Sequence, residues 1–314
     1  MPSTVVPTHQ PPVGRMVTSV RKGPMLTIHP ETLRCCGYLC FWLMVALAMV
    51  VTKVAVDVPE ETALMRVFGY NNICMYWDYS PAREIAAMFY PAVEFCLLGY
   101  LLASHLHVWS SWSQRLVSHR FLVIDRFLVV IEIVLMSWFR MCFVIQATVD
   151  TMPGHTMGFL GLQVVLVIVA IKNLVYFHKL HKSPVAVMQD SIGCHGLLSE
   201  KGQDIVGGFY VFLLVGATLF KISFSVSTFK GDAIVDAKEK GSQGQKIAQL
   251  ADVIWMLLAA VIPFIIAVFQ RKHTDTLHIA LGFDDSKVLG NKDENEEEGL
   301  LVEGGGETTQ GEGA

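Results

Sequence analysis

The stretch of sequence that decides the fold is Phe121–Ala147, which reads FLVIDRFLVVIEIVLMSWFRMCFVIQA. Its apolar residues are nearly continuous and do not alternate with polar ones, as they do in a strand with one wet face. A helix rises ~1.5 Å per residue, so about 20 residues cross the roughly 30 Å hydrocarbon layer of a bilayer. The stretch therefore predicts a membrane-spanning α-helix.

Five other stretches share this apolar character: Cys35–Val56, Pro81–Trp109, Thr156–Phe177, Asp204–Val226 and Ile247–Gln270. Over the whole chain 53% of residues are hydrophobic and 17% are charged, whereas soluble domains carry about 25% charged residues. We therefore predict an all-α fold, a polytopic integral membrane protein with a bundle of about six transmembrane helices. Residues 35–270 form this bundle, and its short loops leave no room for a separate soluble catalytic domain.

Lysine and arginine are concentrated on one side of the predicted bundle. They precede the first helix, follow the last one, and occupy the second and fourth loops. Because cytoplasmic loops are enriched in these residues, we expect both chain termini to lie in the cytosol. An even number of helices agrees with this topology.

The two predicted tails differ in composition. Residues 1–34 contain six prolines, which disfavour a helix, and are expected to form a disordered cytosolic tail. Residues 271–314 form a second cytosolic tail, and from residue 284 onward it contains ten acidic residues and two lysines. A segment with so much charge and so few apolar residues cannot bury enough surface to fold. We expect it to be disordered.

Three residues of the acidic tail, Glu296, Leu300 and Leu301, form a short motif. An acid four residues before a Leu-Leu pair resembles the acidic dileucine signal, which adaptor complexes bind as an extended peptide. The motif predicts adaptor complexes as partners and an endosomal, lysosomal or vacuolar membrane as the location. The plasma membrane is the alternative.

Seven ionisable side chains lie inside the predicted helices: Glu94, Asp125, Glu132, Arg140, Lys172, Lys221 and Asp252. A charge at the centre of a bilayer costs about 2.5–3.5 kcal/mol on insertion scales, so it normally has a partner or lines a cavity. Matching depth in the membrane predicts one ion pair between Glu94 and Arg140. It predicts a second pair between Lys221 and Asp252.

Glu132 is the acid for which we expect a functional role. It lies near mid-membrane without an obvious partner at its own depth, although Lys172 is near enough in depth to pair with Asp125 or Glu132. An unmatched acid favours a transporter or channel for an ion or small solute, which uses the polar face of the third helix. The alternative is a non-catalytic membrane organising, trafficking or regulatory protein, in which the charges fix helix order. A homo-oligomer is compatible with either reading.

Three histidines, His105, His178 and His181, suggest a second alternative, a haem- or metal-binding membrane redox protein. Histidines beside the lipid headgroups explain the same pattern without a metal. We therefore predict no cofactor and no metal. The sequence has no nucleophile elbow, phosphate loop or strong metal-ligand cluster, so it favours a protein that is not an enzyme. The expected partners are the lipid bilayer and the adaptor complexes, and not nucleic acid.

Three cysteines, Cys35, Cys36 and Cys40, lie at the cytosolic end of the first predicted helix. Cysteines beside a membrane are often S-palmitoylated, so these three are candidates for lipidation. Apolar packing is the alternative explanation for them.

Two prolines, Pro91 and Pro263, lie inside the second and sixth predicted helices. Proline has no N–H group, so it frees a carbonyl one turn earlier and predicts a kink. The loop Asp57–Ser80 contains five aromatic residues, which predict a belt at the membrane interface.

The stretch Phe143-Val144-Ile145-Gln146, followed by His155 and Gly158, resembles the six-span autophagy-modulator membrane proteins. The resemblance covers a few positions and assigns no role to any residue.

Overall fold

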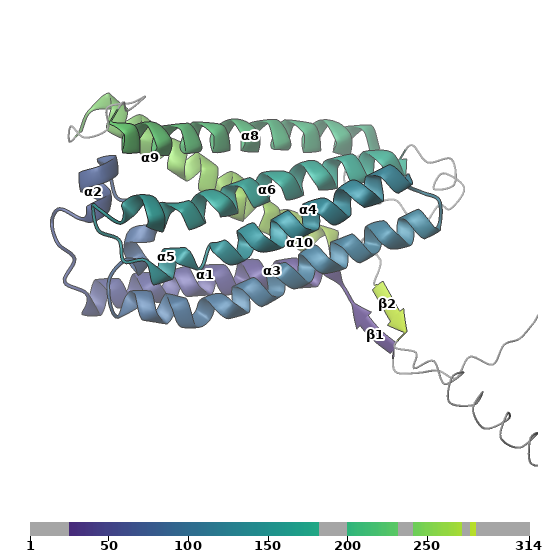
Figure 1. Ribbon diagram of the computed structural model, residues 1–314, viewed down its shortest axis with the longest axis horizontal. Coiled ribbons are helices and arrows are strands. Elements are labelled where there is room, and N and C mark those ends of the chain that lie inside the picture. The colour runs from purple at the N-terminus through teal and green to yellow at the C-terminus, as the bar shows by residue number, and fades with distance from the viewer. Residues whose placement is uncertain (1–24, 182–199, 232–240, 272–276, 281–314) are drawn as a thin grey trace, which may run out of the picture. The chain divides into compact units, whose positions relative to one another are not determined.

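The computed structural model describes residues 25–181, 200–231, 241–271 and 277–280 (Figure 1). Within these residues, six helical segments are long and apolar enough to cross a membrane: Pro30–Ala55, Ala82–Ser113, His119–Val144, Met152–Leu180, Asp204–Lys230 and Gln243–Gln270. Each segment overlaps one stretch predicted from the sequence. The number and position of the predicted helices are therefore confirmed.

The four longest helices are α1 (Pro30–Ala55), α3 (Ala82–Ser113), α6 (Met152–His181) and α8 (Glu200–Lys230). The third apolar segment is divided into α4 (His119–Trp138) and α5 (Met141–Val144), so it is not the single helix that the sequence predicts. The sixth segment contains α9 (Gln243–Met256), the π-helix η2 (Leu257–Val261) and α10 (Ile262–Gln270).

Two short strands, β1 (Met25–Ile28) and β2 (Leu277–Ala280), pair in a two-stranded sheet that the sequence does not predict. Residues 25–27 and 278–280 belong to a compact unit separate from the helices, which lie within residues 28–277.

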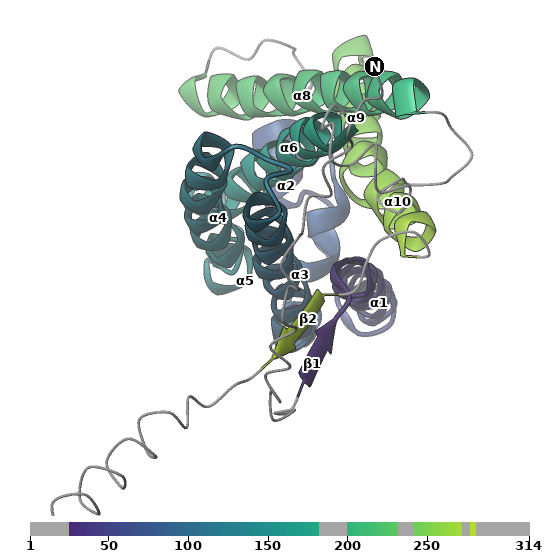
Figure 2. The ribbon, with the colours of Figure 1, turned by 90° about the vertical axis from the view of Figure 1, so that its right-hand side faces the viewer.

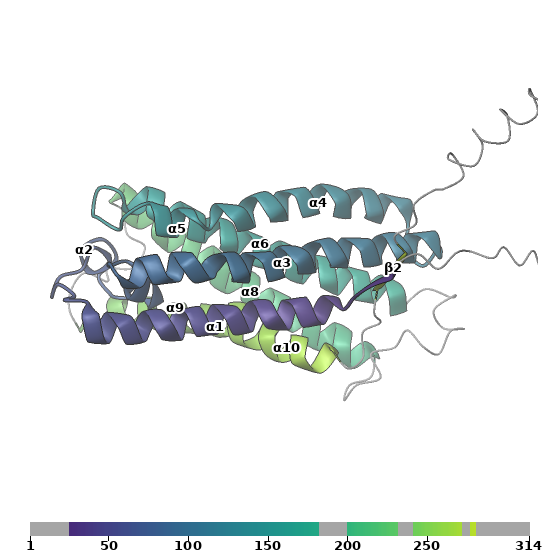
Figure 3. The ribbon, with the colours of Figure 1, turned by 90° about the horizontal axis from the view of Figure 1, so that it is seen from below.

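The long helices of the second unit form a closed ring of neighbours. Helix α1 packs along α3, and α3 packs against α4, α4 against α6, and α6 against α8. The sixth segment completes the ring, because α9 contacts α8 and α10 contacts α1 (Figure 2). Figure 3 shows α1 and α3 side by side along their lengths. The ring brings residues from opposite ends of the chain to a common interior.

A small residue sets the spacing between α4 and α6. A Cβ atom at Gly158 would lie 2.8 Å from the carbonyl oxygen of Trp138, a distance that real Cβ atoms do not reach. Because Gly158 has no side chain, α6 can approach the end of α4 closely. This contact positions the α6 side chains that line the ring's interior.

The loop Asp57–Ser80 packs into the helices instead of forming a belt. It contains α2 (Ala63–Phe68) and the 3₁₀-helix η1 (Ile73–Trp77). Phe68, Tyr70 and Trp77 are buried in the same apolar core as α1 and α3. The prediction of an interfacial belt is wrong for these three residues, because the loop folds back over the ends of the helices and covers them.

Candidate functional site

Four ionisable side chains from three helices meet in a group that we call the charged cluster: His105 of α3, Asp125 and Glu132 of α4, and Lys172 of α6. The Lys172 amino group lies 2.8 Å from Glu132 Oε2 and 3.3 Å from Asp125 Oδ1. His105 Nδ1 lies 2.5 Å from the other oxygen of Asp125. Both carboxylates are fully buried, so the charged cluster is sealed between α3, α4 and α6.

The structure corrects the expectation that Glu132 has no partner. The ammonium group of Lys172 bridges Glu132 and Asp125, which lie on the same face of α4. Depth along the helix axis had made Lys172 a possible partner of either acid, and the structure shows that its flexible four-carbon stem brings the ammonium group to both. An unmatched acid can therefore no longer be the argument for a function at Glu132.

The charged cluster has an unequal number of acids and fixed cations. Two carboxylates face one lysine, so the group carries a net charge of −1 when His105 is neutral and is neutral when one further proton is bound. The charged cluster thus places three groups that can exchange protons, one imidazole and two carboxylates, around one fixed cation.

The other two predicted pairs are present, and they are separate from the charged cluster. Arg140 Nε donates to Glu94 Oε2 over 2.7 Å, and Lys221 donates to Asp252. Lys221 also lies 5.0 Å from the centre of the Trp255 ring. The seven charges singled out in the sequence therefore form three groups, and each of the seven has a partner.

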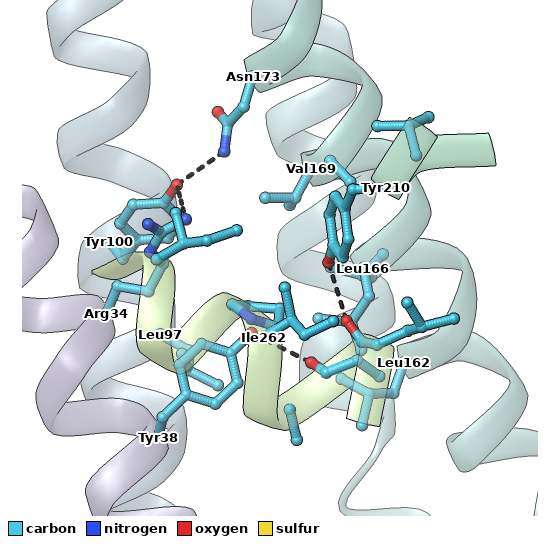
Figure 4. A pocket seen from close by; sticks show the side chains of 18 of the residues that line it. Arg34, Tyr38, Leu97, Tyr100, Leu162, Leu166, Val169, Asn173, Tyr210 and Ile262 are labelled. Atoms are coloured by element: carbon cyan, nitrogen blue, oxygen red, sulfur yellow. Dashed lines mark hydrogen bonds between the residues drawn. The ribbon is translucent and has the colours of Figure 1, made fainter. Parts of the chain in front are cut away.

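A cavity of about 680 Å³, which we call the chamber, lies between α1, α3, α6, α8 and the sixth segment. Figure 4 shows apolar side chains such as Leu97, Leu162, Leu166, Val169 and Ile262 around it. The sequence did not predict the chamber, because it exists only where six helices surround a common interior.

The chamber has one polar end, at which Arg34 and Gln270 meet Tyr100 and Asn173. Arg34 is 8% exposed, and its Nη2 atom donates to Gln270 over 2.7 Å and contacts Glu31 at 2.6 Å. Asn173 donates to the Tyr100 hydroxyl over 2.9 Å, and Arg34 makes a longer contact of 3.5 Å with the same oxygen (Figure 4). Arg34 is one of the basic residues before the first predicted helix, from which we had inferred only the topology.

The π-helix η2 forms one wall of the chamber and supplies two carbonyl groups. The N–H of Ile262 donates to Leu257, five residues back, so the carbonyl of Leu258 loses its usual donor. Pro263 has no N–H to give to Ala259. Tyr210 and Tyr38 donate to these carbonyls instead, over 2.9 and 3.3 Å (Figure 4). The kink predicted at Pro263 is thus part of the chamber wall.

The polar end of the chamber and the charged cluster are neighbours. Lys172 of the charged cluster and Asn173 of the chamber are consecutive residues of α6. Tyr100 and Glu132 are close enough to interact electrostatically. A change of charge in the charged cluster therefore alters the electrostatic potential at the polar end of the chamber.

The histidine and cysteine candidates have different surroundings. His178 Nδ1 lies 2.7 Å from Asp204, and His105 belongs to the charged cluster. Cys35 is buried, Cys40 is half-buried and Cys36 is exposed, so of these three only Cys36 presents a freely accessible thiol. Lipidation of the three cysteines stays a prediction.

Some candidates lie outside the described residues. They are the side chain of His181 and the sorting residues Glu296, Leu300 and Leu301. Within the described part of the chain, no group of three or more histidine, cysteine, aspartate or glutamate residues is placed to hold a metal ion.

The chamber and the charged cluster are the features from which a function can be inferred, because they lie between the helices, are polar at defined points and are adjacent. No protein-family model, no curated protein and no solved structure matches this chain.

Proposed function

We propose that this protein is a multi-pass integral membrane protein that binds a small amphipathic molecule in the chamber and transfers it across the membrane. The observation that carries the proposal is the chamber itself, about 680 Å³ of mostly apolar space with one polar end. Pockets of about 300–1,000 Å³ with apolar walls and a few polar groups are typical small-molecule sites. The six apolar helices support the membrane assignment, and the distribution of lysine and arginine supports two cytosolic termini.

The walls of the chamber favour an amphipathic solute over an inorganic ion. Ion pathways replace the hydration shell of the ion with rings of carbonyl or charged groups. The carbonyls of Leu258 and Ala259 in the chamber wall lack their usual helical donors, but they already accept hydrogen bonds from tyrosines. An apolar molecule with one polar group matches the lining better than a bare ion does.

The charged cluster offers a way to couple transfer to protons. It contains an imidazole and two carboxylates, which are groups that can exchange protons, and it adjoins the polar end of the chamber through Lys172 and Asn173. Buried acids and histidines serve as proton relays in membrane transporters. Binding of a solute at the polar end would change the cost of the buried charge, and the bound proton would in turn change the affinity for the solute.

A second candidate is a non-catalytic membrane organising or regulatory protein that holds a lipid as a structural part. The complete pairing of the seven charges favours it, because paired charges fix helix order without any transport. The two candidates differ in one property: a transporter releases its ligand on the other side, and an organiser retains it.

A fluorescence assay in vesicles tests the proposal. Purified protein is reconstituted into phosphatidylcholine vesicles that contain chain-labelled nitrobenzoxadiazole lysophosphatidic acid or lysophosphatidylcholine. Dithionite, added outside, quenches only the outer leaflet unless the probe crosses. We expect the protein to expose the inner-leaflet pool of at least one probe, whereas protein-free vesicles retain it.

A matched pair of variants assigns this activity to the chamber. Val169→Trp fills the chamber, which Val169 lines, and we expect it to abolish transfer. Val164→Trp makes the same change on the same helix at a residue that is 37% exposed, and we expect it to be active. Equal rates in the two variants, or no transfer by the unmodified protein, would contradict the proposal. Stable binding without transfer would instead support the second candidate.

A further inference from the structure

The polar end of the chamber has hydrogen-bond donors without acceptors. Arg34 is more than nine-tenths buried, and among the described residues its Nε–H has no partner. The hydroxyl of Tyr100 is approached by donors from Asn173 and Arg34, so its oxygen acts as an acceptor. None of the hydrogen bonds within the described residues uses the hydrogen of this hydroxyl. Both residues line the chamber, so two donors at its polar end lack an acceptor among the described residues.

The guanidinium group of Arg34 is held in place by its neighbours. Glu31, one turn earlier on α1, contacts the guanidinium at 2.6 Å, and Gln270 of α10 accepts from the same Nη2 atom. The Tyr100 ring lies 5.2 Å from the guanidinium carbon. Contacts on three sides hold the group in place, and such a preorganised guanidinium is well suited to a carboxylate or phosphate.

The acidic groups near this end are already engaged. Glu31 is paired with Arg34, and Asp204, which also lines the chamber, lies 2.7 Å from His178. A ligand with a cationic head brings no acceptor, so it would leave the Arg34 Nε–H and the Tyr100 hydroxyl unpaired. Buried donors without acceptors are costly, and a ligand that satisfies them gains affinity.

The rest of the chamber is mostly apolar, and its one further donor without a partner among the described residues is the indole N–H of Trp77. The hydroxyls of Tyr38 and Tyr210 are bound to backbone carbonyls, so these side chains offer mainly their rings (Figure 4). Outside the polar end, the other labelled residues in this view are aliphatic: Leu97, Leu162, Leu166, Val169 and Ile262. A chamber of about 680 Å³ has the size of a site for a drug-sized molecule, which suits one acyl chain better than two.

We infer that the chamber binds a single-chain amphiphile whose head is a carboxylate or a phosphate monoester, held by Arg34 Nε–H and the Tyr100 hydroxyl. This inference rests on the proposed function, since it names the ligand class of the same chamber. The shared chemistry is an oxyanion on an apolar chain, from a fatty acid or from a lysophospholipid.

Thermal unfolding of the full-length protein in phosphatidylcholine nanodiscs tests the inference, because a ligand that binds the folded state raises the melting temperature with its concentration. Five probes of graded chemistry are compared: dodecyl phosphate, dodecanoate, dodecanol, dodecyltrimethylammonium and inorganic phosphate. We expect the first two to bind at least tenfold more tightly than dodecanol. We expect no stabilisation by the cationic probe or by inorganic phosphate. Equal binding of dodecyltrimethylammonium and dodecyl phosphate would overturn the inference.

Variants separate the head site from the chamber. Tyr100→Phe removes one donor and keeps the ring, and Glu31→Gln/Arg34→Gln removes both charges together so that neither is left unpaired. We expect each to weaken dodecyl phosphate binding severalfold or more and to leave dodecanol unchanged. Arg120→Gln, at an exposed arginine in the first turn of α4, is the matched control and should bind like the unmodified protein.

The same measurements distinguish this inference from the proposed function. Val169→Trp should lose both dodecyl phosphate and dodecanol, because it fills the chamber itself. If Val169→Trp loses both probes and the head variants lose neither, the chamber stands as the binding site and the assignment of its head group is overturned. If Val169→Trp also binds normally, the chamber is not the site and both proposals fail. Should Glu31→Gln/Arg34→Gln not fold, Tyr100→Phe alone decides between these outcomes.

Discussion

The Tyr38 hydroxyl donates to the carbonyl of Ala259 over 3.3 Å, and Pro263, four residues after Ala259, is the reason that this carbonyl is available. In an uninterrupted helix the N–H of residue 263 would bind it. A tyrosine of the first long helix thereby satisfies a carbonyl that a proline in the last one leaves free. The contact also holds α1 and the sixth segment together at the chamber wall.

This relationship predicts coupling between Tyr38 and Pro263. Tyr38→Phe leaves the carbonyl of Ala259 unsatisfied in a buried position, which should cost about 1–3 kcal/mol of unfolding free energy. In a Pro263→Ala background the new N–H can bind the carbonyl, so the same change should cost less. A double-mutant cycle on unfolding in mixed micelles measures the difference, which we expect to exceed about 0.5 kcal/mol. Tyr76→Phe, in the loop before α3, is a control that should show no coupling to Pro263.

The sequence predicted the helices and two of the ion pairs because both depend on position along a helix axis. Apolar length gave the six helices, and matching depth brought Glu94 to Arg140 and Lys221 to Asp252. Depth also made Lys172 a possible partner of Asp125 or Glu132, but only the structure shows that Lys172 bridges both acids, because this depends on the reach of its side chain.

The chamber depends on tertiary packing that no single stretch of sequence contains. From the sequence, Pro263 was recognisable as the cause of a free carbonyl one turn earlier. The donor to that carbonyl, which belongs to Ala259, is Tyr38, 221 residues before Ala259. The burial of Trp77 also depends on tertiary packing. Its side chain is 1% exposed in the core, and only the fold of the first loop over the helices explains its burial.

Lys172 is the fixed cation that faces the two carboxylates of the charged cluster, so we predict that the folded state requires it. Lys172→Met leaves Asp125 and Glu132 buried without a fixed cation, and removal of one partner from a buried ion pair costs about 3–5 kcal/mol. We expect a fall in the melting temperature and in the yield of folded protein. Adding Glu132→Gln should recover much of the loss, since only one buried carboxylate, Asp125, is then left without a fixed cation. Lys179→Met, at an exposed lysine of the same helix, should be nearly neutral, and failure of the double variant to recover would contradict the charge count.

The Glu94–Arg140 pair predicts an asymmetry between its two members. Glu94 is 2% exposed, whereas the Arg140 side chain is 61% exposed. Arg140→Gln strands a buried carboxylate and should cost about 2–3 kcal/mol, while Glu94→Gln leaves an accessible guanidinium that water or lipid headgroups can solvate. We expect Glu94→Gln to cost less than 1 kcal/mol, as roughly for an exposed pair. Unfolding free energies of the two variants measure the asymmetry, and equal losses would show that burial does not govern this pair.

The contact between Asp78 and His155 predicts a stability that falls as the pH rises. His155 Nδ1 lies 2.9 Å from the carbonyl of Ile145, so it must carry a hydrogen, and Nε2 lies 3.3 Å from Asp78. A bond between Nε2 and the carboxyl group then needs one further proton in the pair. Burial raises the pKa of the Asp78 carboxyl, and the hydrogen bond to His155 opposes this rise.

The sign of the pH effect follows from the raised pKa of Asp78. A pKa that is higher in the folded than in the unfolded state contributes stability that is present below the unfolded value and is lost as the pH rises through the folded one. Asp78→Asn removes this dependence, because its amide can donate to the neutral ring at any pH. The melting temperature of the variant, relative to the unmodified protein, should therefore rise by a few degrees as the pH increases from about 4 through the raised pKa of Asp78. Asp57→Asn, at an exposed acid in the same loop, should follow the unmodified protein at every pH, and an identical pH profile for Asp78→Asn would show that the pair holds no proton.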